Sequence, residues 1–101
     1  MEDRFKTFSQ FYPFYLSEHQ NKICIRLHFM GTALVIFIAV YVLLTFDLPV
    51  LILLPVFGYG FAWIGHFVFE KNRPATFQYP LFSLRGDFEM FKDILIGKIK
   101  L

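Results

Sequence analysis

Three histidines and one glutamate have the residue types and the spacing to do chemistry in this chain. His28 lies 19 residues before Asp47, and His66 lies 19 residues after it. If the two segments run antiparallel about Asp47, both imidazoles lie at the same depth, about 28 Å from the turn at 1.5 Å per residue. Glu70 follows His66 by four residues, which places it on the same helix face one turn further along.

The third histidine, His19, can join this group only if the chain breaks. It precedes His28 by nine residues, or two and a half helical turns, so the two side chains would point in opposite directions on one straight helix. We predict a break at residues 20–22. Imidazoles with a carboxylate suit iron, and also zinc, copper or nickel. Spacing alone does not choose between a metal site and interfacial histidines that hydrogen-bond to lipid or backbone.

Two long apolar segments must position these histidines. Residues 29–46 and 48–69 carry no charge, and only Asp47 separates them. Eighteen helical residues cover about 27 Å, close to the hydrocarbon thickness of a bilayer. We predict one span over residues 22–46 and a second over 48–71, in a tight antiparallel hairpin. Asp47 is expected to cap the second helix and Pro49 to lie in its first turn. A buried hairpin of a soluble protein is the alternative.

The charges give the orientation of the hairpin. All ten Lys and Arg residues lie outside the uncharged segments 29–46 and 48–69, and short basic flanks stay in the cytoplasm. We therefore expect an integral, multi-pass membrane protein with both termini cytoplasmic, in a bacterial inner membrane or, in a eukaryote, the endoplasmic reticulum. The net charge of +2 gives no reason to expect a nucleic-acid partner. Membrane lipid is the expected partner, and a homo-oligomer is an open possibility.

The composition excludes several other classes of protein. Apolar residues make up 56% of the 101 residues, aromatic residues 21% and charged residues 18%. This is too apolar for a disordered chain, and Cys24, the single cysteine, cannot form an internal disulfide. A soluble globule of this length would have to expose many of its apolar side chains.

Two aromatic or apolar stripes flank the spans and predict interfacial helices over residues 4–18 and 83–97. The first stripe is formed by Phe5, Phe8, Tyr12, Tyr15 and His19, and the second by Leu84, Phe88, Phe91 and Leu95. The predicted fold class is therefore an all-α membrane protein. It is a two-span antiparallel helical hairpin flanked by N- and C-terminal interfacial amphipathic helices, in a single membrane domain over residues 1–101.

Small residues predict where the two spans approach most closely. Gly58, Ala62 and Gly65 form a stripe on the second span, and Gly31 lies at a similar depth on the first. Small residues allow helix backbones to pack closely in membranes. We expect the closest packing just below the histidines.

Two blocks of the sequence resemble a known family. They are His19-Gln20-Asn21 with Leu27-His28-Phe29-Met30-Gly31-Thr32, and Gly58-Tyr59-Gly60-Phe61-Ala62-Trp63-Ile64-Gly65-His66 with Glu70-Lys71-Asn72-Arg73-Pro74-Ala75. The later Tyr79-Pro80 and Gly86-Asp87-Phe88 resemble bacterial members of the same family. This is the small membrane family of the fungal 2-hydroxy fatty acid dioxygenase, and the resemblance covers roughly residues 5 to 98.

The resemblance implies an iron(II)-dependent dioxygenase that shortens 2-hydroxy fatty acids by one carbon, by alpha-oxidation with O2. His19, His28 and His66 match the family's histidines and would be the Fe(2+) ligands. Glu70 and Asp87 also match family positions and are the candidate catalytic residues.

The expected substrate fits the predicted position of the site. A 2-hydroxy carboxylate can chelate a metal while its tail lies in the bilayer, and Arg26 or Arg73 is a candidate partner for its carboxylate. Two other functions stay open. One is a haem-binding electron carrier with His28 and His66 as axial ligands, and the other is a small membrane interaction protein without a cofactor.

Overall fold

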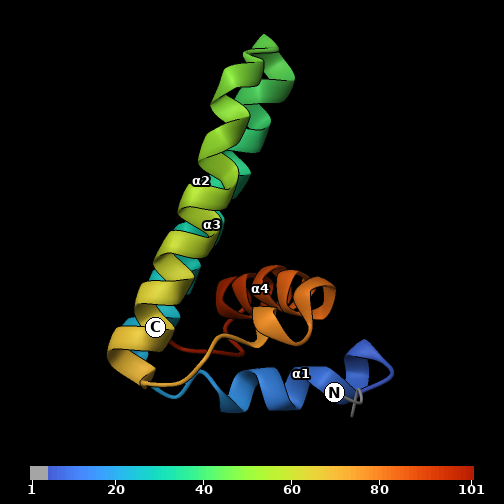
Figure 1. Cartoon of the computed structure of the whole chain (residues 1–101), viewed down its shortest axis with the longest axis vertical. Helices are drawn as coiled ribbons and strands as arrows, with labels where there is room; N and C mark the ends of the chain where they lie inside the picture. Colours follow the sequence, from blue (N-terminus) through green and yellow to red (C-terminus); the bar gives the residue numbers. More distant parts are fainter. Residues whose placement is uncertain (1–4) are drawn as a thin grey trace.

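The computed structural model describes residues 5–101, and all regular structure in that range is helical. The elements in chain order are α1 (Phe8–Ser17), α2 (Lys22–Thr45), η1 (Leu48–Ile52), α3 (Leu53–Ile64), η2 (Gly65–Glu70), η3 (Ala75–Phe77) and α4 (Pro80–Leu95). The helices α2 and α3 form a long antiparallel pair, and α1 and α4 lie at the end of this pair away from its turn (Figure 1). The described chain begins and ends at that same end of the molecule.

Two helical segments of the described chain are long and apolar enough to cross a membrane, Lys22–Thr45 and Leu48–Glu70. Their most apolar windows are only 28% and 11% buried inside the protein. Large apolar side chains therefore face outward along both segments; Phe37, for example, is 71% exposed and Leu44 is 79% exposed. A core helix of a soluble protein would hide this surface from water.

The second apolar segment is not one regular helix. It begins as a 3₁₀ helix with Pro49 in its first turn, continues as α3, and ends as the π-helical turn η2 over Gly65–Glu70. A π turn holds more residues than an α turn, and such turns are frequent at functional sites. The π turn begins one residue before His66, and the left-handed Lys71 ends it at the end of the hairpin that carries the histidines.

The expectation that Asp47 caps this segment is wrong. The Asp47 side chain makes no capping hydrogen bond, and its carboxylate accepts a hydrogen bond from the Tyr41 hydroxyl at 3.1 Å. The turn is closed instead by Phe46, which adopts the left-handed conformation (φ 56°), and by the Thr45 hydroxyl, which accepts the Asp47 N–H at 3.2 Å.

Glycines make the close contacts between α2 and the second segment. A Cβ atom at Gly31 would lie 3.0 Å from the Phe57 carbonyl oxygen, and one at Gly65 would lie 2.8 Å from the Cys24 sulfur. Neither helix has room for a side chain at these positions. The predicted close approach of small residues next to the histidines is confirmed.

Helix α1 packs on α4 through an aromatic core. Phe11, Tyr15 and Met90 are almost fully buried there. Phe11 lies outside the predicted aromatic stripe and is nevertheless fully buried. Helix α1 begins at Phe8 and not at residue 4, because the Thr7 side chain accepts the Gln10 N–H and so caps it. Residue 4 lies outside the described residues.

Helix α4 leaves most of its apolar stripe exposed. It begins at Pro80, three residues earlier than predicted, with proline in the first turn, and it ends at Leu95. The face packed inward carries Ser83, Gly86, Met90 and Asp93. On the opposite side, three of the four residues of the predicted stripe are exposed; Leu95, for example, is 64% exposed.

Candidate metal centre

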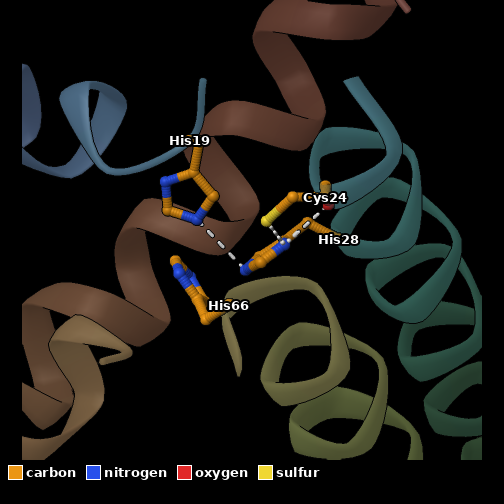
Figure 2. A group of neighbouring side chains, drawn as sticks. All are labelled: His19, Cys24, His28 and His66. Atoms are coloured by element: carbon orange, nitrogen blue, oxygen red, sulfur yellow. Dashed lines mark hydrogen bonds between the residues drawn. The ribbon is translucent and has the colours of Figure 1, made fainter. Parts of the chain in front are cut away.

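Three imidazoles converge at the end of the α2–α3 pair where α1 joins it (Figure 2). The Nε2 atoms of His19 and His28 are 3.1 Å apart. The ring centroid of His66 lies 4.5 Å from that of His19 and 4.9 Å from that of His28. All three side chains are buried, with exposures of 5%, 4% and 3% in chain order. With Cys24, they offer ligand atoms that all lie within 4.8 Å of one another, so this cluster could hold a metal ion.

His19 reaches the cluster through the predicted break in the chain. Helix α1 ends at Ser17 and α2 begins at Lys22. Asn21 caps α2, because its side-chain oxygen accepts the Ile23 N–H at 2.8 Å. The break turns the chain between His19 and His28, so both rings face the same point (Figure 2). The predicted break near residue 21 is confirmed.

Each imidazole uses its Nδ1 atom for a hydrogen bond to an oxygen. The three pairs are His19 with the Tyr15 carbonyl (2.6 Å), His28 with the Cys24 carbonyl (2.9 Å) and His66 with the Asn72 side-chain oxygen (2.7 Å). Carbonyl and amide oxygens only accept, so each Nδ1 must carry the proton. A neutral imidazole protonated on Nδ1 has a lone pair on Nε2, which is the form that binds metals.

The close Nε2 atoms of His19 and His28 therefore face each other as two acceptors. They cannot hydrogen-bond to each other while both Nδ1 atoms keep their protons. Burial and the neighbouring His28 and His66 hold the pKa of His19 well below its usual range, so adding a proton there is unfavourable. A metal ion satisfies both lone pairs, since two nitrogens bound at about 2.1 Å to one ion can lie about 3 Å apart. The donor set fits a metal.

Two residues at the site were missed by sequence reasoning. Asn72 accepts the hydrogen bond from His66 and donates from its Nδ2 atom to the Glu18 carbonyl at 3.2 Å, so it connects the segments that carry His66 and His19. The π turn and the left-handed Lys71 bring Asn72 there, and helical spacing could not have shown this.

Cys24 is the second residue that sequence reasoning missed. It lies one turn before His28, a spacing that could have been noticed. Its sulfur is 3.6 Å from the Nδ1 atom of His28, on the side of the ring away from His19 (Figure 2).

The two candidate catalytic carboxylates lie beside the cluster in different ways. Glu70 accepts the backbone N–H of Asn21 at 2.6 Å and so holds the break in the chain. Asp87, on α4, accepts a hydrogen bond from the Tyr15 hydroxyl, and the Tyr15 ring centroid is 4.2 Å from that of His19. Burial raises the pKa of Asp87 to about 7, although the bond from Tyr15 opposes this shift.

The two candidate arginines have partners outside the cluster. Arg26 donates to the Leu101 carbonyl at 3.0 Å. The guanidinium carbon of Arg73 lies 5.1 Å from the centroid of the Phe77 ring. Either arginine would have to exchange its partner to bind a substrate carboxylate, and that role stays a prediction.

A cavity of about 350 Å³ lies next to the cluster, between α2, α3 and α4. Its wall includes Asp87 and Thr32, and Thr32 is one helical turn after His28. The other lining residues are Val35, Leu54, Pro55, Gly58, Tyr59, Leu84 and Phe88. The cavity is therefore largely apolar, with a carboxyl group on its wall.

Comparison with protein-family models gives a match over residues 5–99, to the family described as 2-hydroxy-palmitic acid dioxygenase Mpo1-like. The match covers all three histidines, Glu70, Asn72 and Asp87. No curated protein and no solved structure matches the chain.

Proposed function

The chain belongs to the Mpo1-like 2-hydroxy-palmitic acid dioxygenase family, and from that premise we propose that it is an iron(II)-dependent membrane dioxygenase that shortens 2-hydroxy fatty acids by one carbon. The observation that carries the proposal is the pair of buried Nε2 acceptors of His19 and His28, 3.1 Å apart, with His66 beside them. Neither Nε2 atom carries a proton, so both lone pairs can bind a metal ion, and an apolar cavity lies nearby.

We assign the iron to His19, His28 and His66. Imidazole is a ligand that suits iron. Bound iron(II) would supply the one-electron chemistry that O2 needs before it reacts with an organic acid. The overall balance is one 2-hydroxy acid and one O2 giving a fatty acid one carbon shorter, CO2 and water.

The surrounding residues support the reaction by holding the imidazoles and excluding water. Tyr15, Cys24 and Asn72 supply the oxygens that keep each Nδ1 protonated and each Nε2 directed inward. We propose that Asp87, fixed by the Tyr15 hydroxyl, accepts a hydrogen bond from the 2-hydroxyl group of the substrate. Glu70 acts on the site through Asn21, by fixing the chain break that lets His19 converge.

We place α2 and the segment Leu48–Glu70 in the bilayer, with both termini on the cytoplasmic side. The positions of Lys and Arg support this orientation, because none of them lies between Leu27 and Glu70. The exposed apolar residues of α4, Leu84, Phe88 and Leu95, support a position for α1 and α4 at the membrane surface. The substrate head then lies at the polar boundary, and O2, which dissolves in lipid, reaches the site from the bilayer.

Crowding argues against the haem-carrier alternative. A haem with His28 and His66 as axial ligands needs a porphyrin plane between the two rings. Their centroids are 4.9 Å apart, and the His19 ring lies within 4.5 Å of both. A Soret band in the absorption spectrum of the purified protein would contradict this argument.

The test is turnover of a defined substrate. Iron-loaded protein in lipid nanodiscs is incubated with 2-hydroxypalmitate and O2, and mass spectrometry measures the fatty acid one carbon shorter. His28→Ala and His66→Ala should each lose iron binding and product. Met30→Ala, whose side chain on α2 is 54% exposed, is the control that should keep both. Iron binding and turnover at wild-type levels in both histidine variants would contradict the proposal.

A further inference from the structure

The cavity between α2, α3 and α4 follows directly from the histidine cluster along the hairpin. On α2, Thr32 is one turn and Val35 two turns beyond His28, so all three share one face. On the returning segment, Tyr59 and Gly58 lie two turns before His66. The cavity thus begins about one helical turn from His28 and continues toward the turn of the hairpin.

We propose that this cavity is the groove for the alkyl chain of the substrate, with Leu54 at its far end limiting the chain length. The class of ligand rests on the proposed function, but the position of the groove rests only on the residues that line it. Its volume of about 350 Å³ falls within the range of small-molecule pockets. The carboxyl group of Asp87 gives the groove one polar wall for the head of an amphiphile.

The distance from His66 to the far end of the groove fits a long acyl chain. Leu54 precedes His66 by 12 residues, which is about 18 Å along a helix at 1.5 Å per residue. An extended alkyl chain with carbon–carbon bonds of about 1.5 Å advances about 1.3 Å per carbon, so this distance corresponds to about 14 carbons. A larger side chain at position 54 should therefore exclude long chains and still admit short ones.

The open side of the groove faces outward between α3 and α4. Leu84 and Phe88 line the groove and are also 46% and 40% exposed. These two residues belong to the apolar stripe on the side of α4 opposite the aromatic core that α4 shares with α1. If α4 lies on the membrane surface, the stripe and the groove form one continuous apolar path, and a chain can slide into the groove from the lipid without crossing water.

Photolabelling tests the groove without requiring turnover. The probe is 2-hydroxypalmitate with a diazirine near its methyl end, bound to the protein in phosphatidylcholine nanodiscs and located by peptide mass spectrometry. We expect labelling at residues 54–55, reduced at least tenfold by excess unlabelled 2-hydroxypalmitate. Labelling that is spread over outward side chains such as Phe37, and that excess acid does not reduce, would overturn the inference, because bulk lipid contact would explain it.

Two pairs of variants test the chain-length limit. Leu54→Trp should lose labelling by the long probe at least tenfold and keep labelling by a ten-carbon probe. Val56→Trp on the same helix, where the side chain is 54% exposed, should label like wild type. In case Leu54→Trp does not fold, Leu84→Trp narrows the open side, and Leu81→Trp, at a position 80% exposed, is its control. Equal long-probe labelling within each pair would overturn the inference.

The groove and the proposed function fail in different ways. Competed labelling at residues 54–55 without formation of a shortened acid would leave the groove standing and contradict the dioxygenase. Turnover of 2-hydroxypalmitate with labelling elsewhere would leave the dioxygenase standing and overturn the groove.

Discussion

Asn72 offers the sharpest test of how the metal centre is held. Its side chain accepts the Nδ1–H of His66 at 2.7 Å and donates to the Glu18 carbonyl at 3.2 Å. Asn72→Ala removes both bonds. Removing the hydrogen-bond partner of a metal-binding histidine typically lowers metal affinity 10–100-fold, or about 1.4–2.8 kcal/mol at 1.4 kcal/mol per tenfold. The bond to Glu18, one residue before His19, contributes about 0.5–1.5 kcal/mol more to the ordering of that segment.

Asn72→Asp separates the two contacts. A carboxylate still accepts the Nδ1–H of His66, more strongly than an amide does, but it cannot donate to the Glu18 carbonyl. We therefore expect the Asp variant to bind iron(II) within about threefold of wild type, and the Ala variant 10–100-fold more weakly. The assay is an anaerobic competition for iron(II) between the protein in nanodiscs and a chromophoric chelator.

The pattern across the two variants decides the outcome. If Asn72→Ala loses iron(II) affinity and Asn72→Asp retains it, the hydrogen bond that orients His66 dominates. If both variants lose affinity equally, the contact with Glu18 dominates and the His66 ring does not need a partner at Nδ1. Wild-type affinity in Asn72→Ala would refute the reasoning about Nδ1 partners altogether.

Three further predictions concern packing, pH and topology. Gly65→Ala places a Cβ atom 2.8 Å from a buried sulfur, so it should destabilise the protein by about 1–3 kcal/mol in denaturant unfolding, whereas Gly60→Ala, with nothing within 4 Å, should not destabilise it. The pKa of Asp87 is about 7 in the folded protein against an ordinary 3.8, so the folded state binds more protons between these values. The free energy of unfolding of the metal-free protein should then fall as pH rises from about 4 to 7, and Asp87→Asn should reduce this slope. Cysteines introduced at Asp47 and Lys98 should react with membrane-impermeant reagents from opposite sides of the membrane, and labelling of both from one side would exclude the predicted topology.

The sequence by itself determined where the main features of this protein lie along the two long helices. Apolar segments of 18 and 22 residues require two long helices. Because an α-helix rises by about 1.5 Å per residue, the equal spacing of His28 and His66 about Asp47 predicted a common depth. The same periodicity showed that His19 needs a break in the chain, and the structure has that break at the Asn21 cap. Each of these features depends on neighbours in sequence, which is why spacing was enough.

The tertiary structure alone decided what each side chain contacts. Tyr15 and Asp87 are 72 residues apart, and their hydrogen bond exists because α1 packs against α4. Asn72, and not Glu70, reaches the Nδ1 atom of His66, because a π turn and a left-handed residue redirect the chain after the helix. Side-chain periodicity gives the position of a residue on its own helix. The partner across an interface depends on how separately formed helices pack, and no local pattern contains that information.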